Sequence, residues 1–532
     1  MKQIGFKNFR KFKDLDAMDF APITVFVGEN NAGKSTVVKG ILALSDFMNQ
    51  LQSIDDSIIL MRDEEEDDRK KINQKLLKDI KFYFNTSYLA HIGTFKRAIY
   101  NKAENDTITF HTKLEYMDVS LNVKGNRNDD EAISGNIIMV NINLPLYNID
   151  MTFDIEKDKV IVKFNHEPIV GGQYILNKKL QEKREKYYNL LKNDAIYTAE
   201  ISSNWYPLRG NLIMSFIYLV EAAINATIVS RKHKAMGYWG PCGAPFINCS
   251  KEEIGILKNI VKTLSPSEMP EEEVLGRFRF SPMMFKPISK MLDIEYIYAH
   301  AVTQTVIYSA KDTNDYLSRT IHEFAPHQKN KSKKEFVIKW MKEFGVGKDF
   351  EIKSVGGEAH VVYITNHDGK QVNLADKGMG SIQLMVLLFR LAITLPHRGT
   401  RGIYFYNEKV VIIEEPEQNL HPMLQSKLAD LLYEINKDYG FRFIIETHSE
   451  YLVRRSQVIV ANENKRAEKE SNTWENPFRV YYFPSDGIPY DMEYAKDGYF
   501  EKPFGKGFFN VSSELSLDLD RIDQGVYNDG QD

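Results

Sequence analysis

A glycine-bearing stretch near the start of the chain, "GENNAGKS" at residues 28–35, constrains the fold more than any other feature of the sequence. Its spacing fits G-x-x-x-x-G-K-[ST], the pattern in which backbone N–H groups surround phosphates while the lysine and the hydroxyl serve the outer phosphates and Mg²⁺. Residues 23–27 form an apolar, β-branched run typical of a strand, and residues 35–48 have the apolar spacing of a helix. Strand, loop and helix follow in the order that phosphate binding requires, so we expect a nucleotide site in an α/β fold.

The loop offers several groups to an anion. The N-terminus of the following helix carries unpaired N–H groups and a partial positive charge. Lys34 adds a mobile full charge, and the Ser35 hydroxyl is a candidate magnesium ligand. An ordinary glycine-bearing turn is the alternative. The residues expected to contact the nucleotide here are Asn30, Asn31, Ala32, Gly33, Lys34, Ser35 and Thr36.

The whole chain has the composition of a globular protein. Of its 532 residues, 43% are apolar and 27% are charged, so a large core is expected, and the length suggests two to four domains. The formal net charge of -4 is too small for nucleic-acid binding by overall charge. Any DNA contact must therefore be a local patch.

Three features bear on the compartment. Cys242 and Cys249 match no common zinc spacing, and we expect free thiols in a reducing cytoplasm, with a disulfide as the alternative. The first residues, "MKQIGFKNFRKF", lack the apolar segment of a signal peptide. The apolar stretch at 212–229 contains Glu221 and Asn225, which are costly in hydrocarbon, so a buried or interface helix explains it better than a membrane span. We therefore expect a cytoplasmic protein without a membrane partner.

The chain divides into four stretches by pattern. Residues 1–173 contain the phosphate loop and, from Thr107 onward, short alternating segments typical of an antiparallel sheet. Residues 174–290 have helical patterns, and we expect a helical insertion that serves as a dimer or partner interface. Residues 291–510 return to strands and helices, and residues 511–532 form an acidic tail. The expected fold class is α/β with an antiparallel β lobe and a helical insertion.

A second motif, "EKVVIIEEPEQNLHP" at residues 408–422, supplies carboxylates suited to phosphate hydrolysis. Glu414 and Glu415 follow an apolar strand, at the end where ligands bind in parallel α/β sheets. One carboxylate can hold Mg²⁺, and the next can orient or deprotonate the attacking water. A surface pair after an edge strand is the alternative. In "FRFIIETHSE" at 441–450 the apolar run leads to His448, which can reach a γ-phosphate or simply be satisfied by local hydrogen bonds.

Four motifs together carry a family resemblance. They are the phosphate loop, "NLADKGMGSIQLMVLLFRLA" at 373–392, "IIEEPEQNLHP" at 412–422 and "IIETHSEYLVRR" at 444–455. In this order they resemble the ATP-binding head of ABC-type ATPases of the RecF, SMC and Rad50 superfamily, and "EEPE-x-x-LHP" is similar to the OLD-like branch. The resemblance covers roughly residues 1–48 and 290–510. It implies a P-loop NTPase fold of the ABC-ATPase head type, ATP and Mg²⁺ as cofactors, and a homodimer or higher oligomer.

The resemblance also implies a role for each motif. The roles are Walker A for Lys34 and Ser35, Walker B for Glu414 and Glu415, the D-loop for 419–422, the switch histidine for His448 and the signature for 376–383. Glu415 and His448 would be catalytic, and Ser35 and Glu414 would hold Mg²⁺. In the signature, Gly378, Gly380 and Ser381 would reach the ATP bound by the partner copy, although the usual Leu-Ser-Gly-Gly-Gln is absent. Most relatives have aspartate where this chain has Glu414, so ATP hydrolysis is expected to be slow.

The resemblance extends to ATPase subunits of bacterial anti-phage systems, especially the PtuA type of Septu and retron-associated systems, which partners an HNH nuclease. The ATPase of the PARIS system, which holds a separate Toprim effector, is the alternative. We expect no Toprim nuclease domain after His448, because the remaining segment is shorter than such a domain needs, and Asp518-Leu519-Asp520 is more simply a solvated tail. The expected partners are a second copy of the chain, an effector nuclease of the HNH or Toprim type, and a retron reverse transcriptase with its DNA or RNA.

Two other functions fit the same motifs. A DNA-repair or DNA-tethering ATPase of RecF type would contact DNA through basic segments, for which residues 178–192, 231–234 and 329–334 are candidates. Such binding would depend strongly on salt, but each segment can equally be a solvated face. A structural scaffold that binds ATP and barely hydrolyses it is the third function.

Overall fold

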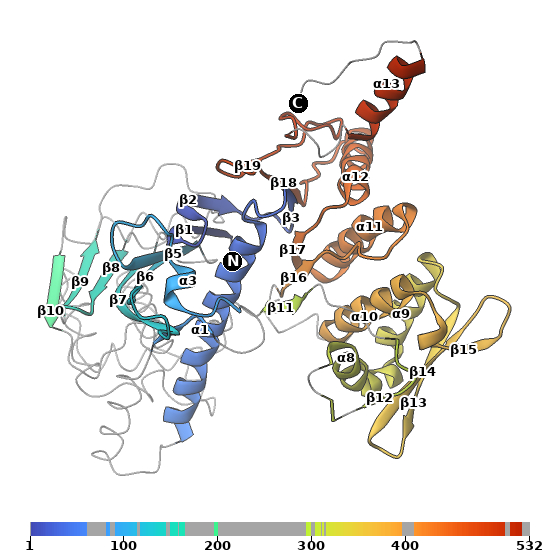
Figure 1. Cartoon of the computed structure of the whole chain (residues 1–532), viewed down its shortest axis with the longest axis horizontal. Coiled ribbons are helices and arrows are strands. Elements are labelled where there is room, and N and C mark those ends of the chain that lie inside the picture. The colour runs from blue at the N-terminus through green and yellow to red at the C-terminus, as the bar shows by residue number, and fades with distance from the viewer. Residues whose placement is uncertain are drawn as a thin grey trace, which may run out of the picture. The chain divides into compact units, whose positions relative to one another are not determined.

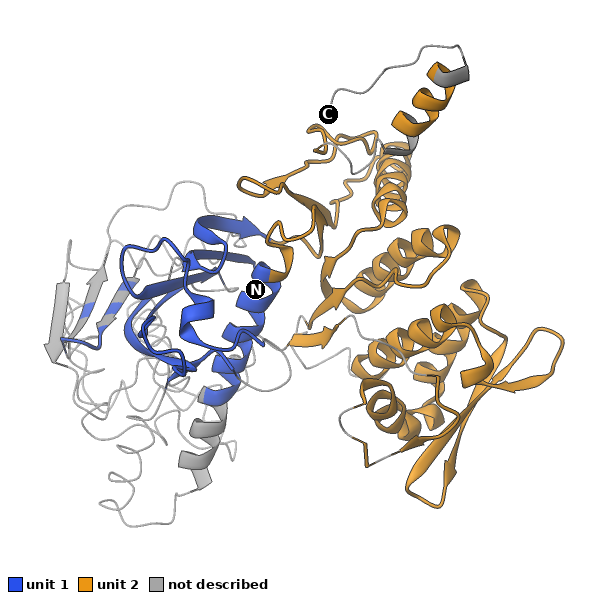
Figure 2. Cartoon of the chain, in the orientation of Figure 1, with its two compact units in different colours: residues 1–19, 36–293 blue, residues 20–35, 294–532 orange. Residues whose placement is uncertain are grey.

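The computed structural model resolves two compact units within the chain. It describes residues 2–60, 81–85, 91–113, 118–144, 149–157, 159–164, 196–200, 294–298, 304–309, 311–312, 315–395, 409–505 and 511–523. One unit comprises residues 1–19 with 36–293, and the other comprises residues 20–35 with 294–532 (Figure 2). The phosphate loop thus belongs to the second unit, although it lies near the start of the chain.

A six-stranded sheet forms the centre of the second unit. Its strands, in spatial order, are β11 (Ile294–Ile297), β16 (Val410–Glu414), β17 (Arg442–Glu446), β3 (Ile23–Gly28), β18 (Phe478–Phe483) and β19 (Tyr490–Asp491). The first five are parallel, and β19 returns antiparallel to β18. Nearly every residue of β3, β16 and β17 is buried, as expected for parallel strands covered on both faces. The carboxyl ends of these three strands therefore lie at one edge of the sheet.

Two helices connect the parallel strands. The helix α11 (Pro422–Tyr439) joins β16 to β17, and α12 (Glu450–Lys469) joins β17 to β18. Pro422 occupies the first turn of α11, where no N–H is needed, and Gly440 ends the helix with φ 71°. The Ser449 side chain caps α12 by accepting a hydrogen bond from the Leu452 N–H at 3.2 Å. These caps fix where each helix leaves the edge of the sheet.

A group of helices with a small sheet completes the second unit (Figure 1). The helices are α8 (Tyr316–Phe324), α9 (Lys331–Glu343) and α10 (Met379–Thr394), with short 3₁₀ turns η2 (Ala325–Lys329) and η3 (Leu374–Asp376). The sheet contains β12 (Tyr308–Ser309), β13 (Asp349–Val355), β14 (Ala359–Thr365) and β15 (Gln371–Asn373), and β13 and β14 form an antiparallel hairpin. The rings of Phe324 and Phe389 stack with centroids 4.5 Å apart, and Phe350 packs on Phe389 at 5.3 Å. Aromatic packing thus joins α8, α10 and β13.

An antiparallel sheet dominates the first unit, as the alternating segments predict. Its strands, in spatial order, are β10 (Ile196–Glu200), β9 (Lys159–Phe164), β8 (Ile149–Asp154), β7 (Ser134–Leu144), β6 (Asp118–Lys124), β5 (Thr107–Lys113), β1 (Gln3–Phe9) and β2 (Phe12–Asp19). The short β4 (Phe82–Tyr83) pairs with β7. In β5 and β6 every second residue is buried, so one face of these strands is covered and the other faces solvent.

The helix α1 (Lys34–Leu60) follows the phosphate loop, and from residue 36 onward it belongs to the first unit. Within that unit Phe47 of α1 packs on Phe82 with ring centroids 5.4 Å apart. At Gly40 a Cβ would lie 2.3 Å from the ring of Phe6, so only glycine allows this approach of the helix to β1. The short helix α3 (Phe95–Ala98) adds Phe95 to the same aromatic core.

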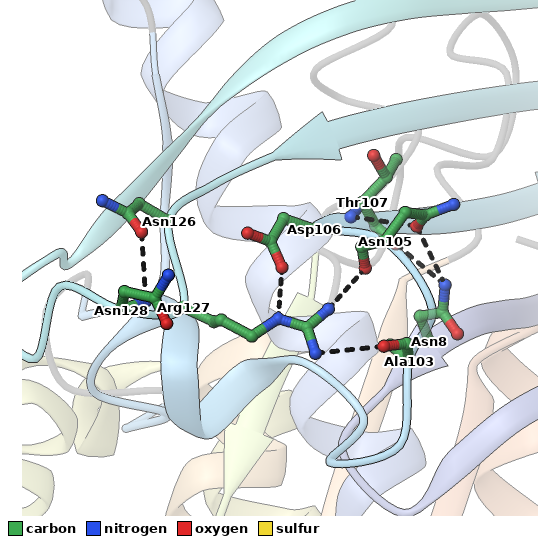
Figure 3. A network of polar contacts seen from close by, with 8 residues as sticks. All are labelled: Asn8, Ala103, Asn105, Asp106, Thr107, Asn126, Arg127 and Asn128. Atoms are coloured by element: carbon green, nitrogen blue, oxygen red, sulfur yellow. Dashed lines mark hydrogen bonds and ion pairs between the residues drawn. The ribbon is translucent and has the colours of Figure 1, made fainter.

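A polar network closes the turn before β5 (Figure 3). The Arg127 side chain pairs with Asp106 and donates to the carbonyl oxygens of Ala103 at 3.0 Å and Asn105 at 2.8 Å. From β1, Asn8 donates to the Thr107 carbonyl at 3.1 Å. The guanidinium thereby satisfies carbonyls of a turn that makes no strand pairing of its own.

Several expectations fall outside the described residues. They are the cysteines, the apolar stretch at 212–229, the basic segments at 178–192 and 231–234, and the helical insertion at 174–290 except for residues 196–200. Those five residues form β10, a strand rather than the helix that we expected. Among the helices that the structure describes, none is long and apolar enough to cross a membrane. The segment expected as an acidic tail begins with α13 (Val511–Asp523), in which Leu515, Leu517 and Leu519 are exposed.

Candidate nucleotide site

The turn after β3 has a backbone that favours glycine at two positions. Gly28 has a φ of 133° and Gly33 a φ of 112°, in a region that L side chains rarely adopt. At Gly28 a Cβ would also lie 2.1 Å from the carbonyl oxygen of Phe483 in β18. The helix α1 begins directly after the turn at Lys34, so its first N–H groups lack partners within the helix. The motif therefore takes the strand, turn and helix form of an anion cradle.

Lys34 is folded onto this turn. Its side chain is buried, and Nζ donates to the carbonyl oxygens of Gly28 at 3.0 Å and Glu29 at 2.9 Å. Burial lowers the pKa of Lys34, while carboxylates around it, chiefly Glu446 and Glu415, act in the opposite direction. The ammonium group thus sits between the loop and a set of carboxylates that lie far away in the sequence.

Ser35 makes the most direct link between the loop and the neighbouring strand. Its Oγ donates a hydrogen bond of 2.7 Å to Oε1 of Glu446, the last residue of β17. Glu446 is 6% exposed, and its Oε2 has no hydrogen-bond partner. Burial raises the pKa of Glu446 to about 7, with the Ser35 hydrogen bond opposing the rise and the nearby Glu414 adding to it.

Glu414 and Glu415 lie where the sequence places them, at the carboxyl end of β16. In the parallel register Glu414 pairs with Glu446 of β17, so the two carboxylates end neighbouring strands. Tyr296 of β11 hydrogen-bonds Glu414; burial first, and then this carboxylate, raise the pKa of the Tyr296 phenol far above its usual value. Glu415 leaves the strand with φ 44°, and its N–H donates to the Glu446 carbonyl at 2.7 Å. Its carboxylate accepts a hydrogen bond from Gln418 Nε2.

His448 is held by a carboxylate that the motif reading overlooked. Glu417 is 8% exposed, and its Oε1 accepts a hydrogen bond of 2.7 Å from the His448 backbone N–H. Burial lowers the pKa of the His448 imidazole, and Lys34 lowers it further while Glu415 opposes the change. The ring is therefore neutral near pH 7 and is influenced by the charges of both the loop and Glu415.

The residues at this edge fit a nucleotide with Mg²⁺. The loop offers N–H groups and an ammonium to phosphate, and Ser35, Glu414 and Glu446 offer oxygen atoms to a hard cation. Within the described part of the chain, no group of three or more histidine, cysteine or acidic side chains could by itself hold a metal ion. Mg²⁺ usually keeps several waters and takes one or two protein oxygens together with the phosphates, so a partial ligand set is what it requires.

The expected signature segment contacts the segment that follows Glu415, which includes the expected D-loop at 419–422. Gly378 caps α10, and a Cβ at Gly380 would lie 2.3 Å from the Asn419 carbonyl oxygen. Asn419 Nδ2 donates to Gln383 Oε1 at 2.8 Å, and Gln383 Nε2 donates to Gln418 Oε1 at 3.1 Å. Gln418 also donates a hydrogen bond to the Glu415 carboxylate. Hydrogen bonds thus connect Gln383 of α10, through Gln418, with the expected catalytic carboxylate of Glu415.

The described basic segment at 329–334 is not a free cationic patch. Lys333 is buried, and its Nζ donates to the Ile393 carbonyl at 2.6 Å. Lys334 lies 3.5 Å from Asp349, and Lys331 lies 3.9 Å from Glu335. Only Lys333 is thus committed to a buried contact, whereas the Lys331 side chain is 88% exposed and accessible to a partner.

The structure thus brings together the loop, Glu414, Glu415 and His448, as the motifs predict. It adds Glu446, Glu417 and Gln418, which sequence reasoning missed. The signal for Glu446 was present, since a charged residue that ends an apolar strand beside two other strand-end carboxylates is unusual.

A model of the AAA ATPase domain family matches residues 1–232 and 250–453 of the chain. A curated relative, the energy-coupling factor transporter ATP-binding protein EcfA of Methanococcus maripaludis, is 38% identical over 66 residues, which are 12% of this chain and 23% of that protein. The chain thus aligns with about a quarter of that relative's length. The match supports a nucleotide-binding ATPase and says nothing of transport.

Two solved structures match most of the chain at low TM-score and low identity. The SMC head domain from Thermotoga maritima has a TM-score of 0.30 at 9% identity, covering 93% of this chain and 98% of that one. The recombination mediator protein RecF of the RecFOR pathway has a TM-score of 0.28 at 9% identity, and the match covers 92% of this chain and 98% of that one. Similarity at this level bears on neither substrate nor partner. The family match shows an ATPase domain, and the parallel strand order around the phosphate loop confirms the α/β class, with an antiparallel β lobe in the first unit.

Proposed function

The chain belongs to the AAA ATPase domain family, and on that premise we propose that it binds and hydrolyses ATP at the carboxyl ends of β3, β16 and β17. One observation carries the proposal. Lys34 and Ser35 of the loop, Glu414 and Glu415 at the carboxyl end of β16, and Glu446 at the end of β17 form one connected set of charges and hydrogen bonds. Phosphoryl transfer needs such positioned charges more than covalent chemistry.

The loop and its lysine bind the phosphates in this proposal. Residues 30–36 offer backbone N–H groups, and Lys34 Nζ exchanges the two loop carbonyls for phosphate oxygens. Ser35 and Glu414 hold Mg²⁺, which when bound neutralises charge on the phosphates. The aligned N–H groups and the ammonium also stabilise the charge that develops on the transferred phosphoryl group.

Glu415 orients the attacking water and accepts its proton. The side chain has a defined position because Gln418 Nε2 donates to it and its own N–H is bound by the Glu446 carbonyl. The neutral imidazole of His448 offers a hydrogen bond to the γ-phosphate. Turnover is expected to be slow, because Glu414 is one methylene longer than the aspartate usual at its position.

Nucleotide binding by Lys34→Ala tests this assignment. Equilibrium binding of a fluorescent ATP analogue should weaken at least about tenfold, since one charge-assisted contact to phosphate is worth about 1.5 kcal/mol or more. Lys502→Ala is the matched control, because Lys502 is an exposed lysine paired with Glu493 in the same unit. Equal binding by wild type and Lys34→Ala would reject the loop as the phosphate site.

We propose further that ATP holds two copies of the chain together through residues 376–383. Gly378 is the N-cap of α10, and no atom lies within 4 Å of where a Cβ would stand, so a ligand can approach the protein backbone closely there. Size-exclusion chromatography of Glu415→Gln with and without ATP tests this proposal. A dimer that forms only with ATP supports it, and a monomer under both conditions contradicts it.

The biological role that we propose is the ATPase subunit of an anti-phage complex, in which nucleotide-driven dimerisation controls a separate effector nuclease of the HNH or Toprim type. Its support is the resemblance of the four motifs to the branch with "EEPE-x-x-LHP". A tagged pull-down from the native host should recover a nuclease, or a retron reverse transcriptase with its nucleic acid, in fixed stoichiometry. Recovery of DNA alone, increased in Glu415→Gln, would instead favour an ATPase of RecF type in DNA repair.

A further inference from the structure

A buried carboxylate oxygen without a partner stands next to the expected magnesium ligand. Glu446 is 6% exposed; its Oε1 accepts the Ser35 hydroxyl at 2.7 Å, and its Oε2 has no hydrogen-bond partner. Leaving a polar oxygen buried and unpaired costs on the order of 1–3 kcal/mol, and more when it is charged. A carboxylate that is kept buried despite this cost is expected to have a role in binding or catalysis besides its structural contact with Ser35.

The backbone places this carboxylate beside the other acidic groups of the site. Glu446 pairs with Glu414 in the parallel register of β17 and β16, and its carbonyl accepts the Glu415 N–H at 2.7 Å. On its other side β17 pairs with β3, the strand that leads into the phosphate loop. Glu446 thus ends β17, the strand between β3 and β16. Its side chain is hydrogen-bonded to Ser35 of the phosphate loop, and its carbonyl is hydrogen-bonded to Glu415 after β16.

The hydrogen bond to Ser35 has a chemical consequence. A serine hydroxyl has one proton and two acceptor lone pairs. Because the proton is donated to Glu446, both lone pairs of Ser35 Oγ remain available to a cation. Second-sphere carboxylates act in this way on other metal ligands, fixing their orientation and raising their basicity.

We propose that Glu446 is a positioning residue for the divalent cation that accompanies ATP, acting through the Ser35 hydroxyl and adding its own negative charge beside the cation. The inference rests on the proposed function, since it takes the loop at 28–36 as the phosphate site. It gives the proposed nucleotide site a third carboxylate, Glu446, besides Glu414 and Glu415. Glu446 ends β17, the strand that leads to His448.

The charge of Glu446 has opposite effects on nucleotide and on cation. A carboxylate near the phosphates repels them when no cation is present and attracts the cation when one is. Removing the charge should therefore leave nucleotide binding in EDTA unchanged or tighter, while the Mg²⁺ requirement rises. Simple damage to the loop would weaken binding under both conditions, so the two explanations differ in sign.

The experiment uses the full chain and follows binding rather than hydrolysis. Binding of a fluorescent ATP analogue is titrated with Mg²⁺, and Mn²⁺ binding in the presence of ADP is followed by electron paramagnetic resonance. Glu446→Val removes both acceptor and charge, and Glu446→Gln keeps an acceptor for Ser35 in nearly the same shape. Glu450→Gln is the matched control, because Glu450 is a nearby glutamate at the start of α12 that pairs with Arg454.

We expect the half-saturating Mg²⁺ and Mn²⁺ concentrations to rise about 10- to 100-fold in Glu446→Val and by less in Glu446→Gln, with no change in Glu450→Gln. Should Glu446→Val not fold, Glu446→Gln alone decides. Cation affinities equal to wild type in a folded Glu446 variant would overturn the inference and leave the proposed function intact. A wild type that binds no nucleotide at any Mg²⁺ concentration would overturn the proposed function, and this inference with it.

Discussion

The buried guanidinium of Arg390 gives a prediction about how α10 is anchored. Arg390 lies on α10, and its Nε donates to the Tyr316 hydroxyl of α8 at 3.2 Å. Its other nitrogens pair with Glu323 of α8 and with Glu295 of β11, the latter at 3.3 Å. Burial alone would lower the pKa of Arg390, but Tyr316 and the two carboxylates outweigh it and raise the pKa. One side chain thus connects α10, on which the expected signature lies, to β11, the strand beside β16.

Arg390→Met keeps the apolar stem and removes these bonds. Breaking a buried pair by removing one partner costs about 3–5 kcal/mol, because the remaining charge is left uncompensated. Two features reduce this figure here. The Glu323 side chain is 41% exposed and can be solvated, and Lys409 remains 3.8 Å from Glu295. We therefore expect a loss of about 2–3 kcal/mol in the free energy of unfolding of the second unit.

Thermal melting followed by circular dichroism measures this loss. For a unit of this size, about 1 kcal/mol corresponds to about 2–4 °C, so Arg390→Met should melt about 5–10 °C below wild type. Arg454→Met is the control, since Arg454 makes an exposed i,i+4 pair with Glu450 and should shift the melting temperature by less than about 2 °C. An Arg390→Met protein that melts with wild type would refute the reasoning.

Three further predictions follow from single contacts. Gly28→Ala should abolish nucleotide binding, because φ is 133° and the new Cβ would strike a β18 carbonyl; retained binding would show that the turn can rearrange. Gln418→Ala should lower kcat about tenfold with little change in KM, because it frees the Glu415 carboxylate, and an equal kcat would contradict this. Burial lowers the pKa of His360, and the neighbouring His322 lowers it further. As the pH falls through about 6.5, the unfolded state therefore binds more protons than the folded state, and the free energy of unfolding decreases. His360→Asn should lose less stability than wild type between about pH 7.5 and 5.5, measured by thermal melting, and a parallel loss in both would refute the role of His360.

The sequence was sufficient to predict the parts of the site that depend on local pattern. The loop at 28–36 is a glycine-rich turn between a strand and a helix, and both acidic residues at 414 and 415 follow a buried strand. These features arise from backbone geometry and apolar periodicity within short windows. They needed no knowledge of the strand order.

The rest of the site depends on contacts between distant segments, which periodicity does not encode. The hydrogen bond from Ser35 to Glu446 exists because β3 inserts between β17 and β18, across more than four hundred residues of sequence. The close approach of Gly380 to Asn419 likewise depends on how α10 packs beside the D-loop. Residues 196–200 lie in a stretch for which the sequence pattern predicts helices. They form a strand because they pair with β9, and that pairing is not encoded in their own pattern.

Hydrolysis by Glu415→Gln tests the central claim most directly. Steady-state phosphate release and binding of a fluorescent ATP analogue are measured on the same preparation of wild type and variant. Since Gln cannot accept the proton of the attacking water, hydrolysis should fall about 100-fold or more while binding of the nucleotide is retained. Hydrolysis by Glu415→Gln at the wild-type rate would contradict the assignment of the catalytic site to the end of β16.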